Sequence, residues 1–150
     1  MTAQEYIESL RRLKTKVFLM GKQVDNFVDH PMIRPSINSV AMTYELAQDP
    51  AYQDIMLADS NLTGKKINRF CHLHQNEQDL IKKVKMQRLL GQKTGSCFQR
   101  CVGMDAFNAV FSTTYEVDQK YHTSYHENFI QYMKYVQEND LTVDGAMTDP

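Results

Sequence analysis

The sequence contains no tryptophan, only three cysteines, and no apolar run long enough to cross a membrane. A membrane-spanning helix needs about 20 consecutive, mostly apolar residues. The N-terminus also lacks the apolar segment of a secretory signal peptide, so an oxidising compartment is not indicated. These absences predict a soluble, cytoplasmic protein with no membrane partner.

An excess of charge of one sign is also missing. Lys and Arg together number 17 and Asp and Glu together 18, which gives a net charge of −1. Nonspecific binding of nucleic acid needs a broad positive surface, so nucleic acid is not an expected partner. There are no internal repeats or low-complexity segments. What remains is a 150-residue chain with 42% hydrophobic and 23% charged residues, which is ordinary for one globular domain.

The spacing of the apolar residues predicts a mainly α fold with a few short strands. Thr2 and Glu5 form a capping box for a first helix, Pro35 opens a second, and Asn76 caps a third. The predicted helices cover residues 3–13, 35–49, 77–90, a cysteine-containing segment that runs to 120, and 121–138. Extended segments are predicted at residues 16–20, 53–58 and 66–70, with the last two paired as a small hairpin.

Apolar residues recur at helical spacing on all five predicted helices, including Tyr6, Ile7, Leu10 and Leu13 on the first and Met104, Phe107, Val110 and Phe111 on the cysteine-containing one. The stripe of the second helix is Ile37, Val40, Ala41, Tyr44 and Ala47. That of the third is Leu80, Ile81, Val84 and Leu90, with Gly91 and Gly95 ending the helix. That of the last is Tyr125, Phe129, Tyr132, Met133 and Val136. The cations of the third helix form a solvated face or, alternatively, meet the phosphates of a nucleotide-bearing substrate or cofactor.

Two of the three cysteines, Cys97 and Cys101, are four positions apart in a segment of helical periodicity. On a helix these side chains would leave the same face one turn apart, so both sulfurs could reach one metal centre. Thiolates favour zinc, copper(I) and iron–sulfur clusters, and such a centre normally needs four ligands. The spacing alone is a weak motif, and taken by itself it favours the alternative that both cysteines are buried apolar residues of a helix face. A disulfide is disfavoured because helical geometry would strain it.

The histidines give no ligand set of their own. Cys71, His72 and His74 are close in sequence, but alternation would place the cysteine and the histidines on opposite sides of an extended segment. His122 and His126 have a possible two-histidine spacing on the last helix, without the H-E-x-x-H pattern of zinc proteases. Local structure is therefore favoured over metal binding at both places.

Four segments carry a more specific signal. They are residues 29–38 (DHPMIRPSIN), 41–50 (AMTYELAQDP), 84–93 and 97–115. Together they resemble the N-terminal domain of the 4-hydroxybutyryl-CoA dehydratase/vinylacetyl-CoA Δ-isomerase family, and the similarity extends over essentially all 150 residues. The resemblance implies that the chain is cut from a larger three-domain enzyme with an acyl-CoA dehydrogenase-like plan. Residues 1–150 would be its helical N-terminal domain, with 141–150 the start of the connection to a missing β-domain.

The resemblance also implies cofactors and site residues. Members of this family contain FAD and one [4Fe–4S] cluster and assemble as homotetramers. Cys97 and Cys101 match two cluster ligands, while the other two, a histidine and a third cysteine, would lie beyond Pro150. Gln99 matches a glutamine near the active centre. The flavin-contacting segment would begin with Met147, Thr148, Asp149 and Pro150.

The implied reaction is dehydration of 4-hydroxybutyryl-CoA to crotonyl-CoA through a ketyl-type radical, with isomerisation of vinylacetyl-CoA, as used in 4-aminobutyrate fermentation. The 150-residue piece alone is expected to be inactive and to bind neither cofactor stably. One alternative is a flavin-dependent aromatic monooxygenase relative; these proteins resemble the chain in domain plan but carry a Gly-Arg-Ser-Pro-Asp string where this sequence has Val102 in place of the arginine. The other is a helical interaction domain without chemistry.

Overall fold

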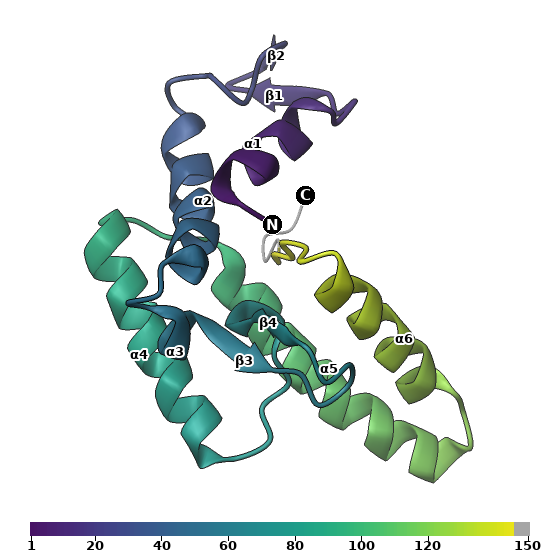
Figure 1. The fold of residues 1–150 in the computed structure, drawn as a ribbon. Coiled ribbons are helices and arrows are strands. Elements are labelled where there is room, and N and C mark those ends of the chain that lie inside the picture. The colour runs from purple at the N-terminus through teal and green to yellow at the C-terminus, as the bar shows by residue number, and fades with distance from the viewer. Residues whose placement is uncertain (146–150) are drawn as a thin grey trace.

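A computed structural model describes residues 1–145 and has the predicted mainly α character, with short strands arranged in two hairpins (Figure 1). The elements are α1 (Ala3–Arg11), β1 (Val17–Leu19), β2 (Lys22–Val24), α2 (Arg34–Gln48), α3 (Gln53–Met56), β3 (Leu57–Asp59), β4 (Lys66–Asn68), the 3-10 helix η1 (Arg69–Cys71), α4 (Glu77–Thr94), α5 (Arg100–Tyr121) and α6 (Tyr125–Glu138). In this part of the chain no helix is long and apolar enough to cross a membrane.

The N-terminal part of the chain packs α1 against α2. The predicted capping box is present, since Thr2 Oγ1 accepts from the Glu5 N–H and the Glu5 carboxylate accepts from the Thr2 N–H. Tyr6 stacks on Tyr44 of α2 with ring centroids 5.3 Å apart. All five predicted stripe residues of α2 are buried. The extended segment near residue 17 is confirmed as β1, and its antiparallel partner β2 was not predicted.

The second hairpin, β3–β4, confirms the predicted pairing of these two extended segments, with Leu57 opposite Asn68. Two details of the prediction were wrong. Residues 53–56 form the short helix α3 rather than a strand. The second strand stops at Asn68 because the Asn68 side chain accepts a hydrogen bond from the Phe70 N–H and thereby caps η1.

Helix α4 differs from its prediction at its end and on its face. Gly91 does not break it; the helix continues to Thr94, and Gly95 provides the left-handed C-cap with φ +60°. Leu80, Ile81 and Val84 are exposed, while Met86 and Leu90 are fully buried. The prediction was wrong here because only the C-terminal half of α4 packs into the cluster that contains Met56 and Phe70.

Helices α5 and α6 form an antiparallel hairpin that extends away from α1 and α2 (Figure 1). The last helix begins at Tyr125 rather than Tyr121, because α5 continues to Tyr121 and ends on His122 in a left-handed C-cap. The Asp118 carboxylate then accepts hydrogen bonds from the Tyr125 and His126 N–H groups and starts α6. Met133 and Val136 are buried as predicted, whereas Tyr125 and Tyr132 are exposed.

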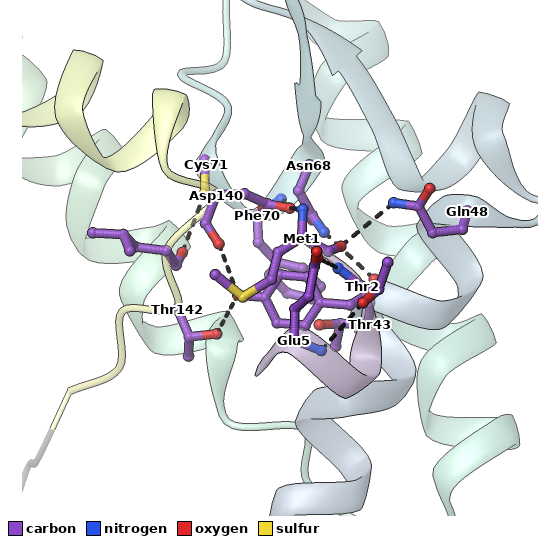
Figure 2. Close-up of polar contacts among 12 residues, drawn as sticks. Met1, Thr2, Glu5, Thr43, Gln48, Asn68, Phe70, Cys71, Asp140 and Thr142 are labelled. Carbon is purple, nitrogen blue, oxygen red and sulfur yellow. Dashed lines mark hydrogen bonds and ion pairs between the residues drawn. The ribbon is translucent and has the colours of Figure 1, made fainter. Parts of the chain in front are cut away.

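After α6, residues 140–145, here called the exit segment, return toward α1 and α2 (Figure 1). They have no regular secondary structure. Asp140 forms an ion pair with the N-terminal amine of Met1 at 2.9 Å (Figure 2). The exit segment thus brings the end of the described chain close to its beginning and to the first turn of α5.

Candidate functional site

The two cysteines of the C-x3-C pair lie at the start of α5, in a turn formed by residues 97–101 that we call the cysteine turn. The helix begins only at Arg100, so the prediction that both cysteines are on one helix face was wrong. Cys97 is exposed in the preceding loop, and Cys101 is half-buried in the first helical turn. The two thiols are nevertheless neighbours, since the Cys97 thiol is one of the groups that shift the pKa of Cys101.

The reason for the late helix start is the backbone of Gln99. This residue has φ +63° and ψ −43°, and the Arg100 N–H donates to the Phe98 carbonyl at 2.7 Å. A hydrogen bond between residues two apart with positive φ at the centre is a γ-turn of the rare, strained kind. The chain therefore reverses sharply between the two cysteines before the helix begins.

The residues on either side of Gln99 hold this turn by packing on one aromatic ring. Phe98 is buried, with its ring centroid 5.7 Å from that of Phe70 in η1. The Arg100 guanidinium carbon lies 4.9 Å from the Phe70 centroid and 4.6 Å from that of Tyr44. Its side chain is only 1% exposed. Two anchors on Phe70 thus fix the conformation of Gln99 from both sides.

The polar contacts of Arg100 reach three parts of the fold. Nη1 donates to Thr43 Oγ1 at 3.0 Å in α2, and Nη2 donates to the Leu141 carbonyl at 3.2 Å in the exit segment. Nη2 also lies 3.7 Å from Cys71 Sγ, while the Asp140 carboxylate is 3.9 Å away. The guanidinium therefore joins α2, η1 and the exit segment behind the cysteine turn.

The exit segment lies directly against this region. Tyr44 Oη donates to the Asp140 carbonyl at 2.9 Å and is 2.7 Å from Thr142 Oγ1; Asp140, Thr142 and Cys71 are drawn in Figure 2. A Cβ added at Gly103 would clash with the Val143 carbonyl and would lie 3.3 Å from the Asp144 nitrogen. Gly103 is therefore the position where the first turns of α5 and the exit segment make backbone contact.

The two less exposed thiols, those of Cys101 and Cys71, both have a raised pKa, but their neighbours differ. The pKa of Cys101 is raised, first by burial and then by the neighbouring Cys97 thiol, while the N–H groups of Val102 and Cys101 at the helix start act in the opposite direction. Burial raises the pKa of Cys71 to about 11, opposed by the nearby Arg100 charge. Cys71 is therefore held as a neutral thiol inside the core.

The other predicted candidates lie in separate surroundings. His72 is buried with Nε2 3.1 Å from Asp79 Oδ2. His126, in α6, contacts the Phe111 ring and forms a hydrogen bond with Thr114 Oγ1. His122 is exposed and caps the end of α5. These two histidines therefore do not lie on the same helix. Among residues 1–145, no three His, Cys, Asp or Glu side chains come together in a metal-binding arrangement. The cysteine pair is at most half of a ligand set.

Reactivity of the three thiols should follow their exposure, and for Cys101 and Cys71 also their raised pKa. In the 150-residue chain at pH 8, we expect Cys97 to be alkylated by iodoacetamide first, Cys101 more slowly and Cys71 last. With a pKa of about 11, Cys71 has only about one thiolate in a thousand molecules at that pH. Peptide mass spectrometry over a time course measures the three rates. Alkylation of Cys71 as fast as Cys101 would contradict the burial described above.

The strain at Gln99 gives a second expectation. A non-glycine residue at positive φ costs on the order of 1 kcal/mol, and glycine adopts this conformation without that cost. We therefore expect Gln99→Gly to keep or increase the free energy of unfolding in urea, despite the loss of a side chain. Gln99→Ala is the matched control, which keeps the Cβ and should not stabilise the chain. Equal effects of both variants would show that no strain resides at this residue.

Comparison with known proteins gives a consistent result. The family described as 4-hydroxyphenylacetate 3-hydroxylase N terminal matches residues 2–150. The chain is 75% identical over 150 residues to 4-hydroxybutyryl-CoA dehydratase/vinylacetyl-CoA Δ-isomerase of Clostridium aminobutyricum, covering 100% of this chain and 31% of that protein. It is 26% identical over 149 residues to the oxygenase component of 4-hydroxyphenylacetate 3-monooxygenase of Thermus thermophilus, covering 99% and 30% respectively.

Solved structures agree. An oxygen-tolerant archaeal 4-hydroxybutyryl-CoA dehydratase from N. maritimus superposes with a TM-score of 0.94 at 54% identity, over 99% of this chain and 29% of that one. The oxygenase component of a 4-hydroxyphenylacetate 3-monooxygenase complexed with FAD superposes with a TM-score of 0.67 at 22% identity, over 95% and 29% of the two chains, which is a likeness of fold alone. The chain thus spans about a third of the length of these relatives. On this basis the predicted resemblance is confirmed, and the chain belongs to the 4-hydroxyphenylacetate 3-hydroxylase N-terminal family.

Proposed function

We propose that the chain is the N-terminal domain of a 4-hydroxybutyryl-CoA dehydratase/vinylacetyl-CoA Δ-isomerase that converts both acyl-CoA thioesters to crotonyl-CoA. The observation that carries this proposal is 75% identity over the whole chain to the Clostridium aminobutyricum enzyme of that name. The whole enzyme would be a cytoplasmic homotetramer acting in 4-aminobutyrate fermentation. Because the chain spans 31% of that relative, the activity belongs to the complete protein.

In this proposal Cys97 and Cys101 are two of the four protein ligands of a [4Fe–4S] cluster. The donor set fits, since thiolates are the usual ligands of such clusters and the two thiols are neighbours at an accessible turn. Burial and the Cys97 thiol raise the pKa of Cys101, and the N–H groups of Val102 and Cys101 at the start of α5 act against this, in the direction that metal binding requires. A histidine and a third cysteine from later in the full-length chain would complete the set.

The remaining roles follow the resemblance. Gln99, which the γ-turn places between the two cysteines, would sit near the reacting substrate. Met147, Thr148, Asp149 and Pro150 lie outside the described residues and are proposed to begin the FAD-contacting segment, with residues 141–150 leading to a β-domain. When bound, FAD supplies one-electron chemistry for a radical route and the cluster supplies a Lewis-acidic iron for the departing hydroxyl. The part of this chain is to hold the two thiols and Gln99 in a fixed, partly desolvated turn.

A second candidate is a flavin-dependent aromatic hydroxylase, favoured by the 26% identity to the Thermus thermophilus oxygenase component. That protein is much more distant than the dehydratase, so this candidate ranks second. A third, a helical interaction domain without chemistry, would leave the strained turn between two accessible thiols without a use.

The deciding experiment uses the full-length protein reconstituted anaerobically. We expect about four irons and four sulfides per chain, a bound flavin, and conversion of 4-hydroxybutyryl-CoA to crotonyl-CoA detected by mass spectrometry. Hydroxylation of 4-hydroxyphenylacetate with reduced flavin, without iron, would favour the second candidate. Absence of both flavin and iron–sulfur cluster would remove the proposed function.

A further inference from the structure

Arg100 is the largest fully buried side chain of the described domain, and it directly precedes one of the proposed cluster ligands. We propose that Arg100 is a positioning residue: its buried guanidinium fixes the orientation in which the cysteine turn presents Cys97 and Cys101 to the rest of the protein. This inference rests on the proposed function, in which those thiols hold a cluster. Its basis is the packing around the turn, described next.

The cysteine turn cannot maintain its shape through its own contacts. Its internal hydrogen bonds are the γ-turn bond from Arg100 to Phe98 and a long contact of 3.8 Å from Cys101 Sγ to the Gln99 carbonyl. Against these stands the backbone strain of a non-glycine residue at positive φ, which Gln99 adopts. The conformation therefore depends on contacts with the rest of the fold, which the side chains of Phe98 and Arg100 make with Phe70 and Tyr44.

The Arg100 guanidinium is held by contacts on several sides, although its Nε has no hydrogen-bond partner among residues 1–145. Aromatic rings of Tyr44 and Phe70 lie near it, and its two terminal nitrogens donate to acceptors in α2 and in the exit segment. This arrangement uses the planar, forked geometry that distinguishes arginine from lysine. Because Arg100 is the first residue of α5, fixing its side chain fixes the start of the helix and the neighbouring Cys101.

The same side chain also fixes the relation between the cysteine turn and the chain that follows the domain. Its bond to the Leu141 carbonyl holds the exit segment, which also contacts the backbone at Gly103. In the proposed function the other two cluster ligands come from beyond this segment. Arg100 is thus placed to fix the position of Cys97 and Cys101 relative to the later part of the chain that would supply the other two ligands.

Burying a charged guanidinium with little electrostatic compensation carries a desolvation cost. The nearest carboxylate, on Asp140, is 3.9 Å away, and the close acceptors of Arg100 are neutral. An apolar residue could fill the same space without that desolvation cost. Arg69 offers a contrast: it is also buried, but its guanidinium donates to the carbonyls of Asp54, Ile55 and Leu57, outside the cysteine turn.

This contrast defines the experiment. Arg100→Lys and Arg100→Met are compared with the matched Arg69→Lys and Arg69→Met in the full-length, anaerobically reconstituted protein. Iron and sulfide content and the electron paramagnetic resonance spectrum of the reduced protein are measured first. After iron is removed with a chelator, the alkylation rates of Cys97 and Cys101 are measured by peptide mass spectrometry, and thermal unfolding is recorded for each variant.

We expect Arg100→Met to lower the iron and sulfide content by up to about 10-fold, the lower end of the effects seen when residues that orient metal ligands are lost, and to alter the resonance spectrum and the ratio of the two alkylation rates. Arg100→Lys should recover part of the iron content, whereas the Arg69 variants should lose thermal stability only. If the methionine variants do not fold, the same measurements on Arg100→Lys and Arg69→Lys decide whether Arg100 has the positioning role.

Wild-type iron content, spectrum and alkylation ratio in both Arg100 variants, together with a loss of stability like that of the Arg69 variants, would overturn the proposal. If the wild-type protein itself holds no iron, the proposed function fails separately. The alkylation ratio then decides about Arg100 alone: a change specific to the Arg100 variants supports the positioning role, and an unchanged ratio rejects it.

Discussion

Replacing Cys97 or Cys101 by alanine in the full-length protein is expected to abolish the proposed iron–sulfur centre and, with it, the proposed conversion of 4-hydroxybutyryl-CoA. Even outer partners of a metal ligand typically change affinity or activity roughly 10–100-fold, so removal of a ligand should exceed that range. Iron and sulfide analysis, visible absorption and product formation after anaerobic reconstitution measure the effect. The physical reason is that the described domain brings no third His, Cys, Asp or Glu ligand near the pair.

Cys71→Ala is the matched control. It makes the same substitution at a cysteine that is buried in the core, with its thiol near the Leu141 carbonyl, and that is not a proposed ligand. This variant should keep iron content and activity and lose only a modest part of its stability. Equal loss of iron in all three cysteine variants would show that the effect is general unfolding. Retention of iron in both Cys97→Ala and Cys101→Ala would exclude the pair as ligands.

The parts of the fold that follow from local rules were predictable. The capping box at Thr2 and Glu5 started α1 where expected, and the apolar stripe of α2 is buried along its length. Helix α4 shows the limit of such rules. Its pattern could not indicate that the N-terminal half lies away from the core, since that depends on which elements pack against it. Glycine at position 91 is likewise tolerated inside the helix.

The candidate site was only partly predictable. The cysteine spacing identified the residues, but the late start of α5 depends on Phe98 and Arg100 both packing on Phe70, almost 30 positions earlier. No local pattern signals a γ-turn at Gln99. The burial of Arg100 could not be predicted either, because an arginine side chain is almost never fully buried unless it is paired. The contact of the exit segment with Gly103 joins two parts of the chain that are 40 positions apart.

That contact leads to the second large expected effect. Gly103→Ala should markedly destabilise the domain, because the new Cβ would overlap the Val143 carbonyl, a backbone group that cannot rotate away. Overpacking of this kind costs about 1–3 kcal/mol, and a backbone clash places the change at the upper end. The expected relief is displacement of the exit segment, which would also separate Leu141 from Arg100. Urea unfolding of the 150-residue chain measures the loss.

Gly91→Ala is a matched control, since Gly91 also lies inside a helix but has no atom within 4 Å of the position of an added Cβ. There alanine should increase the free energy of unfolding by about 0.5–1 kcal/mol through its better helix propensity. The two glycine variants are therefore expected to shift stability in opposite directions. A stabilising effect of both would mean that the exit segment does not lie against α5 in solution, and that Arg100 cannot join the cysteine turn to it.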